Sequence, residues 1–182
     1  MKIKILCTLI CIILFSFISS AENQDEKNDF LLQKEMAGRL KLGMNSNDLY
    51  SIFNKNMTKV IDLKLEGNYC PAIAIFFDEK MEKPSLVAEI SQEDDWHVWR
   101  IRVYDKRYKT KEGIGIGSTY GEINKTYSKK YNVGWSHHSE GDLYVEITEL
   151  KLHFELDVIL SASWSRNNIV PDDTKILSFV VH

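Results

Sequence analysis

The chain has 182 residues with 23 basic and 26 acidic side chains, and its formal net charge at pH 7 is −3. Charges of both signs are interspersed, which excludes the basic face or stripe that nucleic-acid-binding proteins carry. The sequence also contains no basic amphipathic segment of the kind that forms a helix on a membrane surface. We therefore expect a protein whose partners include no nucleic acid.

The first 21 residues are typical of a secretory signal peptide. Lys2 and Lys4 give a basic start, residues 5–18 are apolar, and small residues at 19–21 precede the expected cleavage after Ala21. The apolar run is shorter than the roughly 20 residues that a membrane span needs. We expect a periplasmic or secreted protein with no membrane insertion after cleavage. An uncleaved N-terminal anchor is the alternative.

The cysteines agree with export to a bacterial periplasm. Cys7 and Cys11 lie inside the expected signal peptide, so the mature chain keeps Cys70 and forms no internal disulfide. A chain of about 160 residues can bury an adequate core without disulfides. No base neighbours Cys70 in the sequence, which favours a structural thiol over a nucleophile.

The chain after the signal peptide begins with a polar segment, residues 22–40, in which we expect a short helix. The stretch LGMNSNDLYSIFNK that follows predicts another helix, because Leu49, Ile52 and Phe53 recur at helical spacing after a polar cap. Residues 116–123 (IGSTYGEI) match residues 42–49 (LGMNSNDL) in kind and in register. We interpret the two stretches as a diverged internal repeat. The alternative is a chance match between two amphipathic helix starts.

Alternating apolar residues follow each predicted helix and indicate antiparallel strands. Examples are residues 85–91 and 96–105 in the first half, and residues 142–148 and 151–158 in the second. We expect an α+β fold made of two similar helix-then-antiparallel-strand units, residues 41–110 and 111–182, with the helices packed on one face of a sheet.

The turn-and-helix stretch LKLGMNSNDLYSIFNK resembles the start of the small periplasmic domains of the SmpA/OmlA outer-membrane-assembly lipoproteins. Tandem copies of such a unit are also the plan of the β-lactamase inhibitor protein, and the segment GIGIGSTYGEINKTY is similar to the same turn and helix. The likeness covers about 14 residues in each half, and the chain lacks the lipobox cysteine of the lipoproteins and the disulfides of the inhibitor. The resemblance implies a scaffold that binds proteins and is not usually an enzyme.

The glycine-rich stretch KEGIGIGSTYGEI, residues 111–123, fails both common phosphate-binding patterns. It lacks the third glycine of a dinucleotide-binding fingerprint and the Gly-Lys-Ser/Thr end of a P-loop. Ser118 or Thr119 can instead cap the following helix, and Glu122 suits the positive start of that helix. We therefore expect a turn that begins a helix and no cofactor-binding loop.

No combination of residues in the chain predicts catalysis. His137 and His138 are neighbours in a predicted strand, where consecutive side chains point to opposite faces and do not readily chelate one metal ion. Glu93, Asp94 and Asp95 lie in a predicted exposed turn, and no serine lies in a nucleophile-elbow motif. We expect no enzyme, no metal and no cofactor.

Aromatic and basic residues offer a candidate protein interface, because Trp, Tyr and Arg are the types that anchor such surfaces. Arg100, Arg102 and Tyr104 share the face of a strand opposite to Trp99, Ile101 and Val103, and we expect Trp99 in the core. The predicted interface comprises Trp96, Arg100, Arg102, Tyr104, Arg107, Tyr108, Trp135, His137 and His138. An ordinary solvated strand face with aromatic cross-strand pairs is the alternative.

These features together predict an exported, non-catalytic protein-binding domain. An inhibitor or immunity-type protein that blocks a partner enzyme or toxin is the first hypothesis. A cell-envelope assembly or maintenance factor is the second. A metal-dependent hydrolase at His137, His138 and Glu140 is the third.

Overall fold

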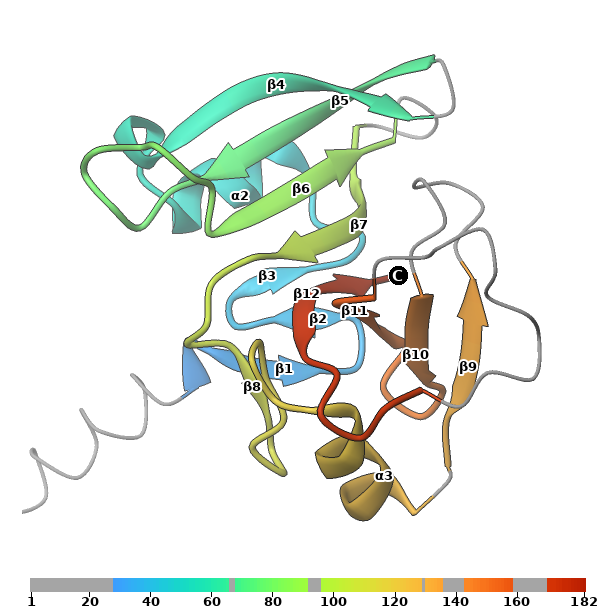
Figure 1. Cartoon of the computed structure of the whole chain (residues 1–182). Coiled ribbons are helices and arrows are strands. Elements are labelled where there is room, and N and C mark those ends of the chain that lie inside the picture. The colour runs from blue at the N-terminus through green and yellow to red at the C-terminus, as the bar shows by residue number, and fades with distance from the viewer. Residues whose placement is uncertain (1–27, 66–67, 92–95, 129, 136–142, 159–169) are drawn as a thin grey trace, which may run out of the picture.

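The computed structural model describes residues 28–65, 68–91, 96–128, 130–135, 143–158 and 170–182. These residues form twelve strands, two α-helices and one short 3-10 helix (Figure 1). No α-helix among them has the length and apolarity that crossing a membrane requires.

Eight of the strands form one antiparallel sheet in the order β4-β5-β6-β7-β12-β11-β10-β9. The sheet consists of two four-stranded meanders, β4 to β7 and β9 to β12, which meet where Val103 of β7 pairs with Phe179 of β12. The strands are β4 (Thr58–Leu65), β5 (Asn68–Ile75), β6 (Leu86–Ile90), β7 (Val98–Val103), β9 (Asn132–Trp135), β10 (Leu143–Ile147), β11 (Leu152–Leu156) and β12 (Ile176–Val181).

A smaller sheet has the order β3-β2-β1-β8, in which β1 and β8 are parallel. Its strands are β1 (Leu31–Gln33), β2 (Met36–Ala37), β3 (Leu40–Lys41) and β8 (Lys109–Thr110). Residues 31–41 therefore contain three strands and no helix, whereas residues 22–27 of the segment in which a short helix is expected lie outside the described residues. Tight turns at Glu35 (φ 62°) and Gly38 (φ 56°) bend the chain back on itself, and a right-handed helix has no place for either conformation.

The expected α+β class is also wrong, because the fold is rich in β-structure. The two helices, α2 (Ser46–Ile52) and α3 (Tyr120–Tyr127), have seven and eight residues, and Leu49 and Ile123 are their buried residues. Helical periodicity lasts only about two turns in each case, so the strands supply most of the core.

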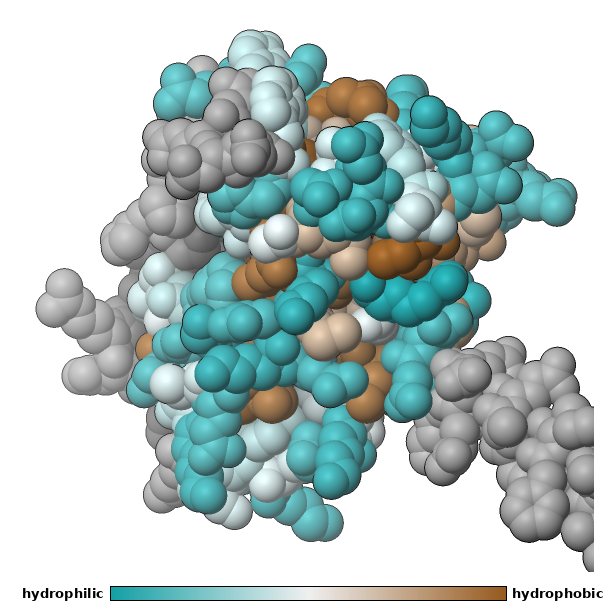
Figure 2. Space-filling view, turned by 180° about the vertical axis from the view of Figure 1, so that it is seen from behind, coloured by the Kyte–Doolittle hydropathy of each residue, from teal (hydrophilic) through white to brown (hydrophobic). Residues whose placement is uncertain are grey.

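The layer that covers the inner face of the large sheet is the small sheet, flanked by the two helices. Leu32, Ala37 and Leu40 of the small sheet belong to the same buried cluster as Ile101 of β7 and Phe154 of β11. In Figure 1, α2 lies behind β5 and β6, and the small sheet lies between α2 and α3. Figure 2 shows the molecule from the opposite side, where hydrophilic residues cover most of the visible surface and hydrophobic ones form small separate areas.

The two glycine turns that precede the helices make the same hydrogen bonds. Gly43 has a φ of 78° and donates its N–H to the carbonyl of Val98, at the start of β7. Gly117 has a φ of 89° and donates to the carbonyl of Ile176, at the start of β12. Each turn therefore pairs with the last strand of the meander that follows it.

The helix caps correspond in the same register. The side chain of Asn45 accepts a hydrogen bond from the N–H of Asp48, and the side chain of Thr119 accepts one from the N–H of Glu122. Glu122 also accepts a hydrogen bond from the N–H of Thr119, which completes a capping box. The expected cap at Thr119 is confirmed, whereas the division into units 41–110 and 111–182 stays a prediction.

Candidate functional site

The outer face of the large sheet, which points away from the small sheet and the helices, carries the richest group of polar and aromatic side chains. We define this outer face by residues of β6, β7, β10, β11 and β12 and of the positions that directly follow β7 and β12. They are Glu89, Trp99, Arg100, Arg102, Tyr104, Tyr144, Glu146, His153, Glu155, Ser178 and His182.

Glu89 lies on β6 and is fully buried. Arg100 donates hydrogen bonds to its Oε2 from Nε at 2.8 Å and from Nη2 at 2.6 Å. Arg102 donates from Nε to the other oxygen, Oε1, at 2.6 Å. The guanidinium groups are themselves mostly covered, with 14% and 17% of the side chains exposed. Two cations thus hold one buried carboxylate, which satisfies the requirement that a buried charge be paired.

The network continues from β7 across β12 to β11. Nη1 of Arg102 lies 3.6 Å from a carboxylate oxygen of Glu155, and the hydroxyl of Ser178 donates a hydrogen bond to the other oxygen of Glu155. Arg102 therefore bridges two carboxylates, one buried and one partly exposed. This bridge ties the first meander to the second on the outer face.

A β-bulge brings Trp99 to the outer face. The pairing of β6 with β7 shifts between Glu89 and Ile90, so that Glu89 pairs with Arg100 while Ile90 pairs with Val98. Trp99 is the extra residue and is 39% exposed, so the expectation that strict alternation places it in the core is wrong. The guanidinium carbon of Arg100 lies 4.3 Å from the centre of its ring, in a cation–π contact.

His153 lies on the same outer face, on β11, two strands away from β7. Its ring stacks on Tyr144 at a centroid distance of 4.5 Å, meets His182 edge-on at 3.9 Å, and lies 3.9 Å from a carboxylate oxygen of Glu146. Burial, helped by the neighbouring His182, lowers the pKa of His153 to about 4. Burial also lowers the pKa of His182. Both rings are therefore neutral at pH 7.

The structure brings three of the predicted interface residues together, namely Arg100, Arg102 and Tyr104. Tyr104 follows β7 directly and is 44% exposed. Arg107 and Tyr108 instead line a pocket beside α2. Contrary to the expectation of an exposed side chain, Tyr108 is 1% exposed and belongs to the core, because its ring packs edge-on against Phe30 at 5.2 Å.

The other predicted interface residues are Trp96, Trp135, His137 and His138. Trp96 is 53% exposed and has a φ of 54°. Trp135 packs against the core from β9, since it pairs with the buried Leu143. His137 and His138 lie outside the described residues, as does Glu140. The part of the chain that the structure describes contains no group of three or more His, Cys, Asp or Glu side chains that could hold a metal ion.

Sequence reasoning missed Glu89 and Trp99 as site residues. A signal for Glu89 was present, because a single carboxylate interrupts the apolar run Leu86–Ile90 and a buried charge needs a partner. The arginines that pair with Glu89, Arg100 and Arg102, lie on the next strand of the sequence and alternate with its apolar residues. Trp99 gave no such signal, since a bulge cannot be read from alternation alone.

Comparison with known proteins identifies a fold and no family. No protein-family model matches the chain, and no curated protein matches it. The structure is similar to the crystal structure of the uncharacterized protein yfeY from Escherichia coli, with a TM-score of 0.55 over 84% of this chain and 98% of that chain. The sequences are 12% identical, so the similarity shows a common fold alone. The resemblance of the turn-and-helix segments to the assembly lipoproteins stays a prediction.

Proposed function

We propose that this chain is an exported, non-catalytic protein-binding domain that acts as an inhibitor or immunity-type protein. The observation that carries the proposal is the Trp99–Arg100 pair, which is fixed above the buried carboxylate of Glu89. Trp, Tyr and Arg dominate the binding energy of protein interfaces when their neighbours hold them in place.

The outer face suits a partner because its side chains are already ordered. Arg100 is held at both Nε and Nη2, so its contact with Trp99 needs little further ordering on binding. Side chains that are fixed before association lose less entropy when a complex forms, and this raises affinity. The exposed fractions of Trp99 and Tyr104, 39% and 44%, leave ring surface for a partner.

The charges of the outer face favour a partner with a mixed or mildly basic surface. Glu89, Glu146 and Glu155 give three negative charges against the two positive charges of Arg100 and Arg102. Complementary charge supports the rate of association and the choice of partner more than the affinity itself. We therefore expect a partner surface that places an arginine or lysine near Glu146 or Glu155.

To test this, the full-length gene is expressed, and the protein that the cells produce from it is purified and immobilised. Envelope and secreted proteins are passed over it, and any protein retained at a stoichiometric ratio is purified and assayed for its own enzymatic or toxic activity. The proposal predicts that adding this chain at an equimolar ratio suppresses that activity. Retention of outer-membrane assembly proteins with no loss of any activity would favour the envelope-assembly function instead.

Two matched variants assign the interaction to the outer face. Trp99→Ala removes an aromatic ring from that face, whereas Tyr69→Ala removes an even more exposed ring, 72% exposed, from the far end of β5. The proposal predicts that the first variant loses the partner and the second retains it. If both retain the partner equally, the outer face is not the interface.

A further inference from the structure

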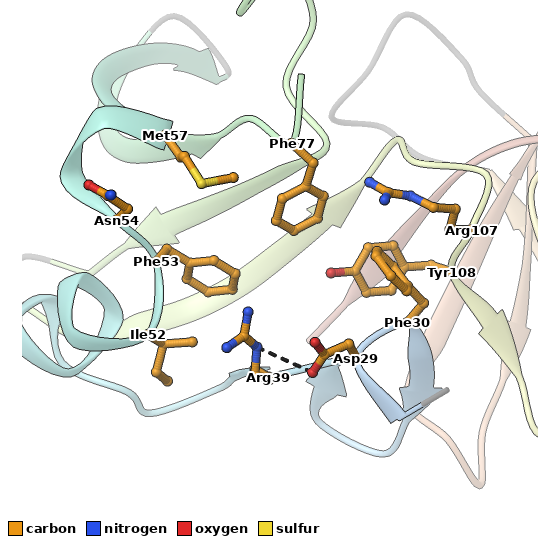
Figure 3. A pocket seen from close by; sticks show the side chains of 10 residues that line it. All are labelled: Asp29, Phe30, Arg39, Ile52, Phe53, Asn54, Met57, Phe77, Arg107 and Tyr108. Atoms are coloured by element: carbon orange, nitrogen blue, oxygen red, sulfur yellow. Dashed lines mark ion pairs between the residues drawn. The ribbon is translucent and has the colours of Figure 1, made fainter. Parts of the chain in front are cut away.

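A cavity of about 280 Å³ lies where the end of α2, the start of β1 and the β7–β8 connection meet (Figure 3). It lies apart from the outer face, and its walls combine four aromatic rings with two guanidinium groups. These are Phe30, Phe53, Phe77 and Tyr108, with Arg39 and Arg107.

The aromatic rings form continuous walls. Phe30 meets Phe77 edge-on with a centroid distance of 5.9 Å, and Phe77 lies 6.1 Å from Phe53. Arg107 packs on this wall, with its guanidinium carbon 4.2 Å from the centre of Phe30 and 5.2 Å from that of Phe77. Asp105 holds this guanidinium, since Nη2 of Arg107 donates to Oδ2 at 2.6 Å. The walls are therefore preformed, as in most sites for small ligands.

Arg39 is the less committed of the two cations. Its Nε lies 3.3 Å from Oδ1 of Asp29, and among the described residues this is its one ion pair. The guanidinium carbon lies 5.6 Å from the centre of Phe53, and Figure 3 shows the terminal nitrogens directed into the cavity. Of the residues that line the cavity, two carry positive charge and Asp29 carries negative charge, so the lining has a net charge of +1.

Tyr108 adds a neutral donor to the cavity. Figure 3 shows its hydroxyl directed into the space between Phe30 and Phe53. Burial raises the pKa of Tyr108, so the hydroxyl keeps its proton at neutral pH and can donate it to an acceptor. A guanidinium and a phenolic hydroxyl that face the same space are suited to a carboxylate.

We propose that this cavity binds a small carboxylate whose other end is an aromatic ring. The ring lies against Phe53 and Phe77, and the carboxylate binds the terminal nitrogens of Arg39 with the hydroxyl of Tyr108 nearby. The volume is at the small end of the range for ligand sites and suits a single-ring acid. This site is independent of the protein-binding function of the outer face.

The test uses 3-phenylpropionate as the probe and 3-phenylpropanamide as its neutral counterpart of nearly the same size. Both are titrated into the full-length gene product, purified in the form that the cell yields, and binding is followed by isothermal calorimetry and by NMR chemical shifts. We expect saturable binding of the acid, about tenfold or more tighter than that of the amide, because hydrogen bonds to a charged group are the stronger ones. Equal affinity for the two compounds, or no saturable binding of the acid, would overturn the proposal.

Three variants assign the binding to this cavity. R39M should reduce the affinity for the acid to that for the amide and leave the affinity for the amide unchanged. K125M, which removes the exposed positive charge of Lys125 on α3, should change neither affinity. F77L should weaken the binding of both compounds. Acid binding that is unchanged in R39M and in F77L would contradict the proposed site. If R39M does not fold, the difference between acid and amide in the unaltered protein, together with F77L, still decides the question.

A last titration distinguishes a free acid from the end of a peptide chain. A tetrapeptide that ends in phenylalanine offers the same ring and carboxylate, and its C-terminal amide is the control. Tighter binding of the free-carboxylate peptide than of 3-phenylpropionate would identify a chain terminus as the ligand. Exclusion of the peptide while the acid binds would identify a free small acid.

Discussion

The guanidinium of Arg100 makes two hydrogen bonds to one oxygen of Glu89, at 2.8 and 2.6 Å, and Glu89 is fully buried. Such a pair contributes less to stability than its short distances suggest, because both charges lose their hydration. Its removal is nevertheless costly, since the charge that remains has no partner. Glu89 therefore fixes the position of the Arg100 guanidinium, and this guanidinium contacts the ring of Trp99.

The first prediction concerns Glu89→Gln. The variant leaves Arg100 and Arg102 beside a neutral amide in a mostly buried place, and we expect a loss of roughly 3 kcal/mol in the free energy of unfolding. Chemical denaturation monitored by tryptophan fluorescence measures this loss. Glu149→Gln, which removes a carboxylate from an exposed turn, is the matched control and should change the free energy by less than about 0.5 kcal/mol. Equal stability of the two variants would contradict the importance of the buried pair.

Charge reversal of Arg100 and Arg102 would disrupt the buried pair and is therefore a poor probe of binding. With both residues changed to glutamate, three carboxylates would meet where Glu89 is buried. We expect this double variant to be unfolded by far-UV circular dichroism. A folded double variant would mean that Glu89 does not depend on the two arginines.

The second prediction compares two glycines with positive φ. A Cβ at Gly38 would lie 1.9 Å from the carbonyl oxygen of Asp29, whereas a Cβ at Gly117 has no atom within 4 Å. Gly117→Ala should therefore cost only the unfavourable backbone conformation, about 1 kcal/mol, and Gly38→Ala should cost considerably more. Thermal unfolding of the two variants side by side gives the comparison. A Gly38→Ala protein as stable as Gly117→Ala would show that the turn between β2 and β3 can relax.

The third prediction concerns pH and His153. Its pKa is about 4 in the folded protein and about 6.5 in an unfolded chain, so the unfolded state binds the proton more readily. The contribution of this histidine to stability is complete above pH 6.5 and is lost as the pH falls from about 6.5 to about 4, on the order of 3 kcal/mol in total. The pKa of about 4 includes the effects of three charged or titratable neighbours of this ring. His182 and Arg100 lower the pKa of His153, and Glu146 raises it.

The measurement for His153 is the slope of the free energy of unfolding against pH. His153→Gln removes the titrating group, so the variant should lose less stability than the unaltered protein between pH 6.5 and 4. The comparison cancels the carboxylates that titrate in both proteins. Parallel slopes for the two proteins would show that His153 remains solvated.

Local signals predicted several parts of the fold. Ser118 and Thr119 were both expected as possible caps and the structure uses Thr119, and the alternation of Leu152, Phe154 and Leu156 indicated β11 correctly. The overall class was wrong because two short helical patterns were given the weight of full helices. The helix predicted for residues 31–41 was wrong. The apolar residues of this segment suit a helix, but its turns at Glu35 and Gly38 depend on tertiary contacts.

The candidate site was predicted in part for a physical reason. Arg100 and Arg102 alternate correctly with the core, so their common face could be read from the sequence. Their partner Glu89 lies on a neighbouring strand, and strand register is fixed by pairings that one sequence does not show. The bulge at Trp99 and the joining of the two meanders by Arg102 and Glu155 arise only in the assembled sheet.

We propose that the outer face binds a protein through the ordered Trp99–Arg100 pair. The most direct measurement is the affinity of the purified partner for Trp99→Ala and for Tyr69→Ala, each compared with the unaltered chain. A buried anchor residue contributes about 2 kcal/mol or more, so Trp99→Ala should weaken binding by about 30-fold or more while Tyr69→Ala stays within about threefold. Equal affinities for the three proteins, with all of them folded, would contradict the claim.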